Sequence, residues 1–150
     1  MPLAAQTVVD LTATAVRTVA ALASSTHTDR AWPFDEAELP AARVLAGSED
    51  FEPGTIHGLE LHQLTVEVEL RVSAAADLDD AMHELTASVL TAVHGAAAVS
   101  ARRSAGVQSF DTRSIARRME PAGQAKAGAV DIEFLARFYT QAAAPETIVN

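Results

Sequence analysis

Residues 64–72 alternate between apolar and polar side chains without a break. This two-residue period places the apolar residues on one side of an extended chain and the polar residues on the other. The pattern predicts a strand with one buried and one solvated face, and therefore a sheet that is covered on one side. The apolar set is Leu64, Val66, Val68, Leu70 and Val72, and the polar set is Thr65, Glu67, Glu69 and Arg71.

A helix is predicted to follow this strand directly. Asp77 stands where a capping residue belongs, and the apolar residues after it recur every three or four positions. Gly95 lies at the far end, where a left-handed C-terminal cap is common. The apolar stripe consists of Leu78, Met82, Leu85, Val89 and Val93.

The remaining segments show weaker patterns of the same two kinds. The phase of the alternation slips at His62-Gln63, which predicts a bulge or the start of pairing there. Residues 96–106 show no clear structure. Elsewhere we expect a helix at 4–23, a short strand at 41–46, an acidic loop at 47–58, strands at 107–119 and 130–139, and a frayed or partner-bound tail at 142–150.

Together these elements predict one domain over residues 1–150. Consecutive strands are separated by short, hairpin-like connections, which favours antiparallel pairing. The expected fold class is α+β: a two-layer sandwich with a mainly antiparallel sheet of about four strands and two helices packed on one face. At 150 residues such a chain can bury a sizeable core without covalent staples.

Composition excludes several classes of protein. The chain has no cysteine, so disulfides, thiolate zinc sites and cysteine catalysis are ruled out. A net charge of −9 argues against a protein that reads nucleic-acid sequence, because phosphate contacts need clustered basic side chains. No stretch has the length of a membrane span, and the opening lacks the pattern of a signal peptide. We therefore expect a soluble protein that is used inside a cell or packed into a particle.

No motif for chemistry is present in the sequence. The histidines do not form a metal-binding helical pair, and the serines lie in no nucleophile elbow. Asp77, Asp79 and Asp80 lack the later glycine and glutamate of a calcium loop, and their place at a helix start explains them. We predict no catalytic, cofactor-binding or metal-binding residue, no cofactor and no enzyme activity.

The charge is unevenly distributed along the chain. Residues 1–100 hold 4 basic and 15 acidic side chains, whereas residues 101–150 hold 7 basic and 5 acidic ones. One interpretation is a simply mixed surface. The other is two faces of opposite sign that meet in neighbouring copies of the chain. In that case the candidate contact residues are Glu36, Glu38, Glu49, Asp50 and Glu52 on the acidic side and Arg102, Arg103, Arg113, Arg117 and Arg118 on the basic side.

Trp32 and Phe34 are large apolar residues in a polar stretch. They either fold back over a sheet edge or helix end, or fill a pocket on a neighbouring subunit, because interface hot spots favour tryptophan. Both residues are therefore candidates for a subunit or partner interface.

Several segments in this order resemble the phage tail terminator family, also called minor tail protein U-like proteins. The resemblance covers nearly the whole chain, although residues 96–106 depart from the family pattern. The matching segments are Asp35-Glu36-Ala37-Glu38-Leu39-Pro40-Ala41, Leu64-Thr65-Val66-Glu67-Val68-Glu69-Leu70, Asp77-Leu78-Asp79-Asp80-Ala81, and the final strand over 129–140 with its preceding glycine turn.

The resemblance implies a structural role without catalysis or cofactor. Such proteins form a homo-oligomeric ring of six copies on the head-proximal end of a long non-contractile tail. The ring ends polymerisation of the tail tube protein and offers a surface to a head-completion or connector protein. DNA passes through it without sequence-specific binding, and no membrane is involved. The implied location is the virion tail, reached from the host cytoplasm during assembly. A head-completion or neck adaptor protein, or a small ligand-binding or enzymatic α+β domain, are the alternatives.

Overall fold

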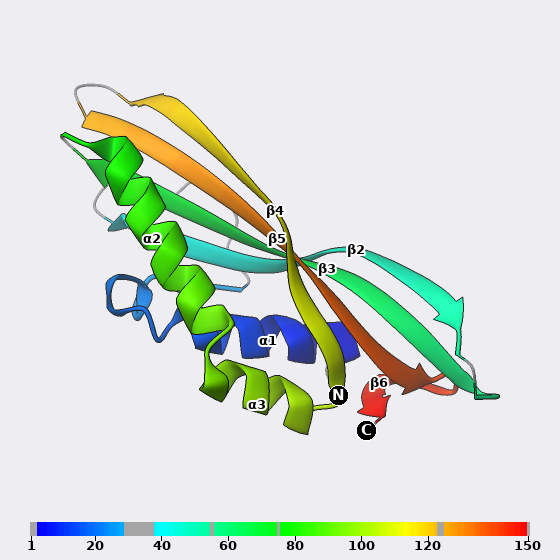
Figure 1. Cartoon of the computed structure of the whole chain (residues 1–150). Coiled ribbons are helices and arrows are strands. Elements are labelled where there is room, and N and C mark those ends of the chain that lie inside the picture. Colours follow the sequence, from blue (N-terminus) through cyan, green and yellow to red (C-terminus); the bar gives the residue numbers. More distant parts are fainter. Residues whose placement is uncertain (1–2, 29–37, 55, 75, 123–124, 150) are drawn as a thin grey trace.

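The computed structural model describes residues 3–28, 38–54, 56–74, 76–122 and 125–149. Three helices and a long, twisted sheet make up this part of the chain (Figure 1). Trp32, Phe34 and Glu36 lie outside the described residues. The elements are α1 (Ala4–Val16), a 3-10 turn η1 (Ala20–Leu22), β1 (Thr26–His27), β2 (Ala41–Pro53), β3 (Leu59–Ala74), α2 (Leu78–Val93), α3 (Ala96–Ser104), β4 (Val107–Ala122), β5 (Ala125–Gln141) and β6 (Ala144–Val149).

The sheet corrects the predicted fold class. Within the described residues it has six strands in the order β1-β2-β3-β5-β4, with β6 also paired to β5, rather than about four. It is mixed, because β1 runs parallel to β2 while the other pairs are antiparallel. Three α-helices are present rather than two. The extra strands arise because short segments at 26–27 and 144–149, which carry little pattern of their own, pair with longer neighbours.

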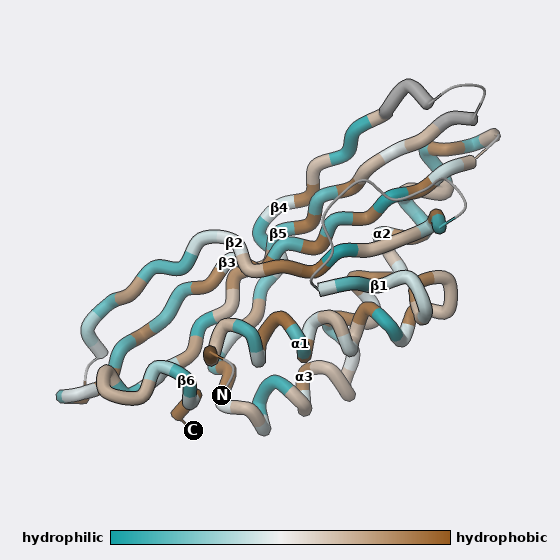
Figure 2. Tube along the Cα trace, turned by 180° about the vertical axis from the view of Figure 1, so that it is seen from behind, coloured by the Kyte–Doolittle hydropathy of each residue, from teal (hydrophilic) through white to brown (hydrophobic). Residues whose placement is uncertain are grey.

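The alternating pattern of residues 64–72 is confirmed in β3. Leu64, Val66, Val68 and Leu70 are fully buried and Val72 nearly so. Their neighbours across β5 are the equally buried Val130, Ile132, Phe134 and Ala136. These side chains form one core with α1 and α2, which cover this face (Figure 1). The opposite face, with the odd-numbered residues of β3 and β5, carries no helix and is called the helix-free face below. Figure 2 shows the resulting alternation of hydrophilic and hydrophobic residues along the strands.

The bulge predicted at His62-Gln63 lies on the neighbouring strand instead. The pairing of β3 with β5 is continuous, whereas that of β2 with β3 shifts between Ala46 and Glu49. The apolar phase slips in β3 because His62, a polar residue, occupies the buried face with an exposed fraction of 2%. The slip in the pattern therefore marks a change of residue type in β3 and not a break in its geometry.

The two caps predicted for the second helix are only partly right. Helix α2 covers the predicted range, and Asp77 is its N-cap residue, with Asp79 and Asp80 in the first turn. However, Asp77 makes no side-chain capping bond and adopts a left-handed backbone with φ of 52°. Gly95 is not a left-handed cap. Its φ of −66° is extended, and it begins α3, which occupies the region expected to lack structure.

Four further boundaries differ from the sequence expectation. Helix α1 ends at Val16 and is followed by a turn, so the predicted helix at 4–23 is too long. Strand β2 continues through the predicted acidic loop to Pro53, because β3 pairs with it along that whole length. Strands β4 and β5 form one long hairpin. The tail predicted to fray contains β6, which pairs with Tyr139–Gln141 of β5.

Candidate assembly surfaces

The sheet has an open side at each of its two outer strands. On one side, β1 pairs with β2 only at Ala42 and Arg43, so within the described residues the outer edge of β2 from Val44 to Pro53 has no strand partner. On the other side, β4 is the last strand of the sheet. Unpaired backbone N–H and C=O groups on such edges are ready to pair with another chain.

The two open edges carry opposite charge. The open part of β2 has three acidic residues and no basic one, namely Glu49, Asp50 and Glu52. Strand β4 has the three exposed basic residues Arg113, Arg117 and Arg118 in the stretch 112–119, which Asp111 and Glu120 flank. Part of the charge asymmetry along the sequence therefore lies on the two outer strands of one sheet.

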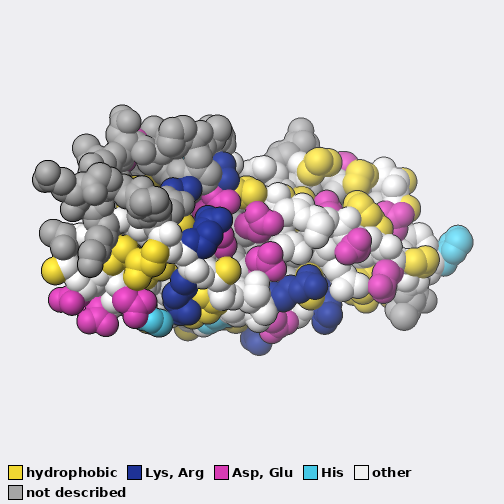
Figure 3. All heavy atoms as spheres, turned by 90° about the horizontal axis from the view of Figure 1, so that it is seen from above, with side chains coloured by type: hydrophobic (Ala, Val, Ile, Leu, Met, Phe, Trp, Pro, Cys, Tyr) yellow, Lys and Arg dark blue, Asp and Glu magenta, His cyan; other side chains and the backbone are white. Residues whose placement is uncertain are grey.

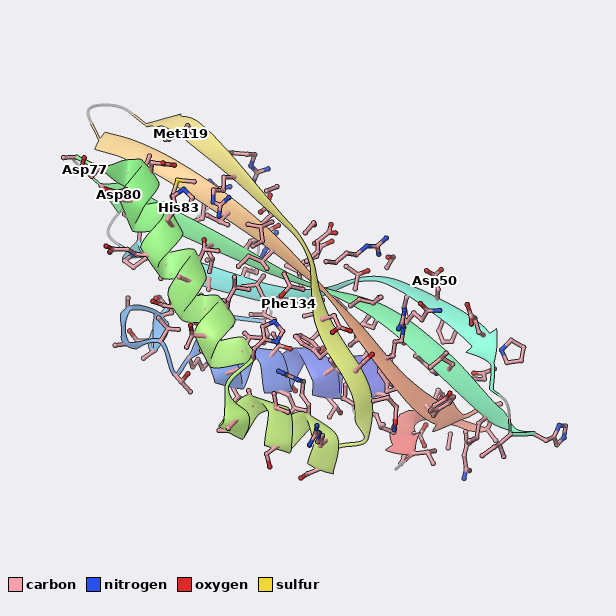
Figure 4. All side chains as sticks on the ribbon, viewed as in Figure 1. Asp50, Asp77, Asp80, His83, Met119 and Phe134 are labelled. Atoms are coloured by element: carbon pink, nitrogen blue, oxygen red, sulfur yellow. The ribbon has the colours of Figure 1, made fainter. Side chains whose placement is uncertain are left out.

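Some of these charges are already paired inside the subunit. The carboxylate of Glu49 lies 2.7 Å from Nδ1 of His62, that of Glu52 accepts a hydrogen bond of 3.0 Å from Gln63, and Arg118 lies 3.2 Å from Asp131. In contrast, the side chains of Asp50, Arg113 and Arg117 form no ion pair or hydrogen bond within the described part of the chain. Figure 4 shows Asp50 projecting from β2, far along the sheet from Met119 of β4.

A shallow hollow of about 490 Å³ lies on the helix-free face between the two edges. Strands β2, β3, β5 and β4 all contribute to it, so it follows the curl of the sheet. Its charged lining is balanced, with two carboxylates and two guanidinium groups. The lining residues are Asp50, Gln63, Thr65, Asp111, Thr112, Arg113, Leu135 and Arg137.

Next to this hollow, four carboxylates form a cluster on the helix-free face. Glu67 is directly opposite Glu133, and Glu69 is directly opposite Asp131. Arg43 binds Glu69 at 2.7 Å. Partial burial, together with the negative charges of Glu133, Glu69 and Asp131, raises the pKa of Glu67 above its ordinary value of 4.5. Figure 3 shows basic and acidic side chains interspersed over the visible face.

Arg102, one of the predicted interface residues, lies in the interior of the subunit. Its exposed fraction is 4%. Its Nη2 donates a hydrogen bond of 2.7 Å to the carbonyl of Val93, the last residue of α2, and its guanidinium carbon lies 4.2 Å from the ring centre of Phe110. Burial lowers the pKa of Arg102. Desolvation and the charge of Arg102 also lower the pKa of His94, which hydrogen-bonds Thr112. Arg102 therefore holds α2, α3 and β4 together.

A second buried polar group was not found from the sequence. His62 lies between Glu49 and Thr140, with 2.7 Å from Nδ1 to the carboxylate and 2.7 Å from Nε2 to the Thr140 hydroxyl. Its ring stacks on Phe138 at 4.8 Å. The order of carboxylate, imidazole and hydroxyl is that of a catalytic relay, but the exposed fraction of Thr140 is 0%. A substrate cannot reach this hydroxyl, so the cluster stabilises the far end of the sheet.

The other predicted interface residues are not gathered in one place. Glu38 is half-buried and precedes β2, Arg103 is exposed on α3, and Arg117 and Arg118 are exposed on β4. No signal in the sequence distinguished the buried Arg102 from the exposed Arg103 beside it. The residues that Arg102 contacts in the interior, Val93 and Phe110, lie on other elements.

Two kinds of feature are absent from the described residues. No three histidine, aspartate or glutamate side chains there are grouped so that they could bind a metal ion. None of the described helices combines the length and the apolar character needed to span a membrane.

The chain is distantly similar in structure to known proteins. No protein-family model matches the chain, and no curated protein matches it. Among solved structures, the chain is similar to one from the virion of a native gene transfer agent particle. The sequences are 14% identical, the TM-score is 0.47, and the match covers 86% of this chain and 92% of the other.

Proposed function

We propose that this chain is a structural protein that assembles with copies of itself into a ring, and that the ring caps a phage tail tube. The observation that carries the proposal is the pair of open, oppositely charged sheet edges. A subunit with two complementary edges forms head-to-tail contacts, and such contacts give a closed ring when the rotation between copies closes.

The family resemblance supports the same role. The segment at 64–70 forms the middle of β3, the segment at 77–81 begins α2, and the segment at 129–140 lies within β5. The end of the acidic segment leads into β2. In the proposed role, the ring stops addition of tube subunits at the head-proximal end of the tail and presents a surface to a head-completion or connector protein.

The carboxylate cluster supports the passage of DNA without specific binding. Glu67, Glu69, Asp131 and Glu133 lie on the helix-free face, and the chain as a whole has a net charge of −9. Arg43 pairs with Glu69 and Arg118 with Asp131, so Glu67 and Glu133 are the members of the cluster without an ion pair in the described part of the chain. In the proposed ring this face lines the hole, where carboxylates repel phosphate groups. Replacing Glu67 and Glu133 by lysine is expected to create salt-sensitive retention of duplex DNA that the wild-type ring lacks.

The ring is tested by measuring the mass of the purified protein over a range of concentrations, with and without tail tubes of the same particle. We expect a closed assembly of six copies in electron micrographs and binding to tube ends. Particles made without the protein should have tails of uncontrolled length. A protein that is monomeric at all concentrations and does not bind tubes would overturn the proposal. Tails of normal length that fail to join heads would instead indicate the neck adaptor.

A further inference from the structure

We infer that the contact between neighbouring copies is an antiparallel pairing of the open edge of β4 in one copy with the open edge of β2 in the next. This inference rests on the proposed ring and specifies the surface that closes it. The occupant of each edge is a second copy of this chain.

Strand direction allows this pairing. Strand β3 is antiparallel to β2, β5 is antiparallel to β3, and β4 is antiparallel to β5. Strands β2 and β4 therefore run in opposite directions. Copies around a ring keep the same orientation, so β4 of one copy meets β2 of the next as an antiparallel neighbour, and the two sheets become continuous.

Charge selects this pairing over the two symmetric ones. Pairing β4 with β4 in a twofold dimer would bring Arg113 and Arg117 near their own copies, and pairing β2 with β2 would do the same with Asp50. Like charges that face each other across strands are destabilising, and opposite charges are stabilising. The side chains of Asp50, Arg113 and Arg117 are exposed and have no partner within the described part of the subunit.

Register brings the two charge groups together. Within one subunit, Asp50 lies level with Gln63, Arg137 and Ser109 across the sheet. Closing a sheet into a barrel requires a stagger, of about one residue per strand at a tilt near 36°. Each copy contributes four strands across its full width, so the stagger per copy is about four residues. Counted through the pairing with β5, four positions along β4 from Ser109 lead to Ser114, next to the register shift that contains Arg113. A stagger of that size toward the end of β4 therefore brings Arg113 close to Asp50 of the next copy.

The test uses two variants of the full chain, one for each edge. Variant one carries Asp50→Lys and Glu52→Lys, and variant two carries Arg113→Glu and Arg117→Glu. Each places like charges across the proposed contact, so each alone is expected to raise the concentration of half-assembly by about tenfold or more. Circular dichroism and urea unfolding of each monomer establish that both variants are folded. Asp79→Lys with Asp80→Lys, on exposed positions of α2, and Arg103→Glu, on α3, are the matched controls and should assemble like wild type.

An equimolar mixture of the two variants gives the decisive measurement. Each copy of variant one then meets variant two at both of its edges, with opposite charges in both contacts, so alternating rings form again. Restored assembly in the mixture supports head-to-tail pairing of β4 with β2. Rings that persist in each variant alone overturn the edge contact and leave the proposed ring standing. A mixture of folded variants that does not assemble also overturns the edge contact. A wild-type protein that never assembles overturns both the edge contact and the ring.

Discussion

In the centre of the sheet, β3 and β5 pair without interruption from Leu59 opposite Gln141 to Ala74 opposite Lys126. The strands outside them differ in two ways. Both β2 and β4 contain register shifts where they pair with the central strands, and each leaves one side without a strand partner over much of its described length. The central pair is thus saturated with backbone hydrogen bonds, and the outer pair is not.

Side chains show the same contrast. The central strands send an unbroken apolar row into the core, whereas residues 111–114 and 116–119 of β4 are all exposed. The centre is complete within one chain, because helices cover one of its faces and strands lie on both sides of it. At the edges, backbone groups of β2 and β4 have no strand partner, and the side chains of Asp50, Arg113 and Arg117 have no ion pair, within the described part of the chain. Substitutions in the centre are therefore expected to change folding, and substitutions at the edges are expected to change assembly only.

The largest expected effect is at the centre. Phe134, labelled in Figure 4, is fully buried in β5. Its ring stacks on that of Phe110, with 5.0 Å between ring centres. Phe134→Ala is expected to lower the free energy of unfolding by about 3–5 kcal/mol, because it leaves a cavity in the core. Urea unfolding measures this loss. Phe51→Ala is the control, since Phe51 is 57% exposed on β2, and it should cost about 1 kcal/mol or less. Equal losses in the two variants would contradict the division between centre and edge.

The second prediction concerns the junction of the helices with β4. Arg102→Met keeps most of the side-chain volume but removes the hydrogen bond to the Val93 carbonyl and the contact with Phe110. We expect a loss of about 1–2 kcal/mol, because the last carbonyl of α2 loses a charged donor. Arg103→Met, at the exposed neighbour, should stay within about 0.5 kcal/mol of wild type. If Arg102→Met raised stability, the desolvation of the guanidinium would outweigh its contacts.

The centre and the outer strands of the sheet also differ in how far the sequence predicts them. The alternation from Leu64 to Val72 predicts β3 correctly because one-sided burial imposes a two-residue period. Strand β4 is predicted at 107–119 and extends to Ala122. Its apolar residues Val107, Phe110 and Ile115 pack against the core at irregular spacing, so burial imposes no two-residue period, and its last residues follow from pairing with β5. Helix α3 has no wide apolar stripe, although its alanines favour a helix. Arginine is usually exposed, so the burial of Arg102 could not be predicted without the positions of Val93 and Phe110.

The sequence shows an acidic first part and a basic last part, and the structure places some of their members, Glu49, Asp50 and Glu52 on β2 and Arg113, Arg117 and Arg118 on β4, on the two outer strands of the sheet. Arg102 and Arg103 lie elsewhere, on α3. What the sequence does not contain is the register, since Asp50 and Ser109 become level only through the pairing of four strands. The Glu49–His62–Thr140 cluster was missed for the same reason, because its members are brought together by two separate strand pairings.

A change in stability smaller than those of Phe134→Ala and Arg102→Met is expected at the carboxylate cluster, on the helix-free face of β3 and β5. Glu67→Gln removes a negative charge directly opposite Glu133 and should raise the free energy of unfolding by about 0.2–1 kcal/mol at pH 7, toward the lower value because solvent screens the pair. The pKa of Glu67 is raised in the folded state, so its contribution to stability is fully present below pH 4.5 and is lost as the pH rises through the folded-state pKa. The advantage of Glu67→Gln should therefore be near zero below pH 4.5 and grow above it. An advantage that is constant with pH would assign the effect to packing.

The smallest expected effect on folding is at the edge, where a substitution should weaken assembly but leave the stability of the monomer nearly unchanged. Arg117 is exposed on β4 and forms no ion pair within the described part of the chain, so Arg117→Glu should change the free energy of unfolding of the monomer by no more than about 0.5 kcal/mol. The same substitution should weaken assembly, because it places a carboxylate on the edge that meets the acidic β2 of the next copy. Urea unfolding of the monomer and sedimentation across concentrations measure the two quantities separately. A variant that loses stability and assembly in proportion would show that this edge belongs to the fold, whereas loss of assembly alone identifies it as a surface kept for another copy.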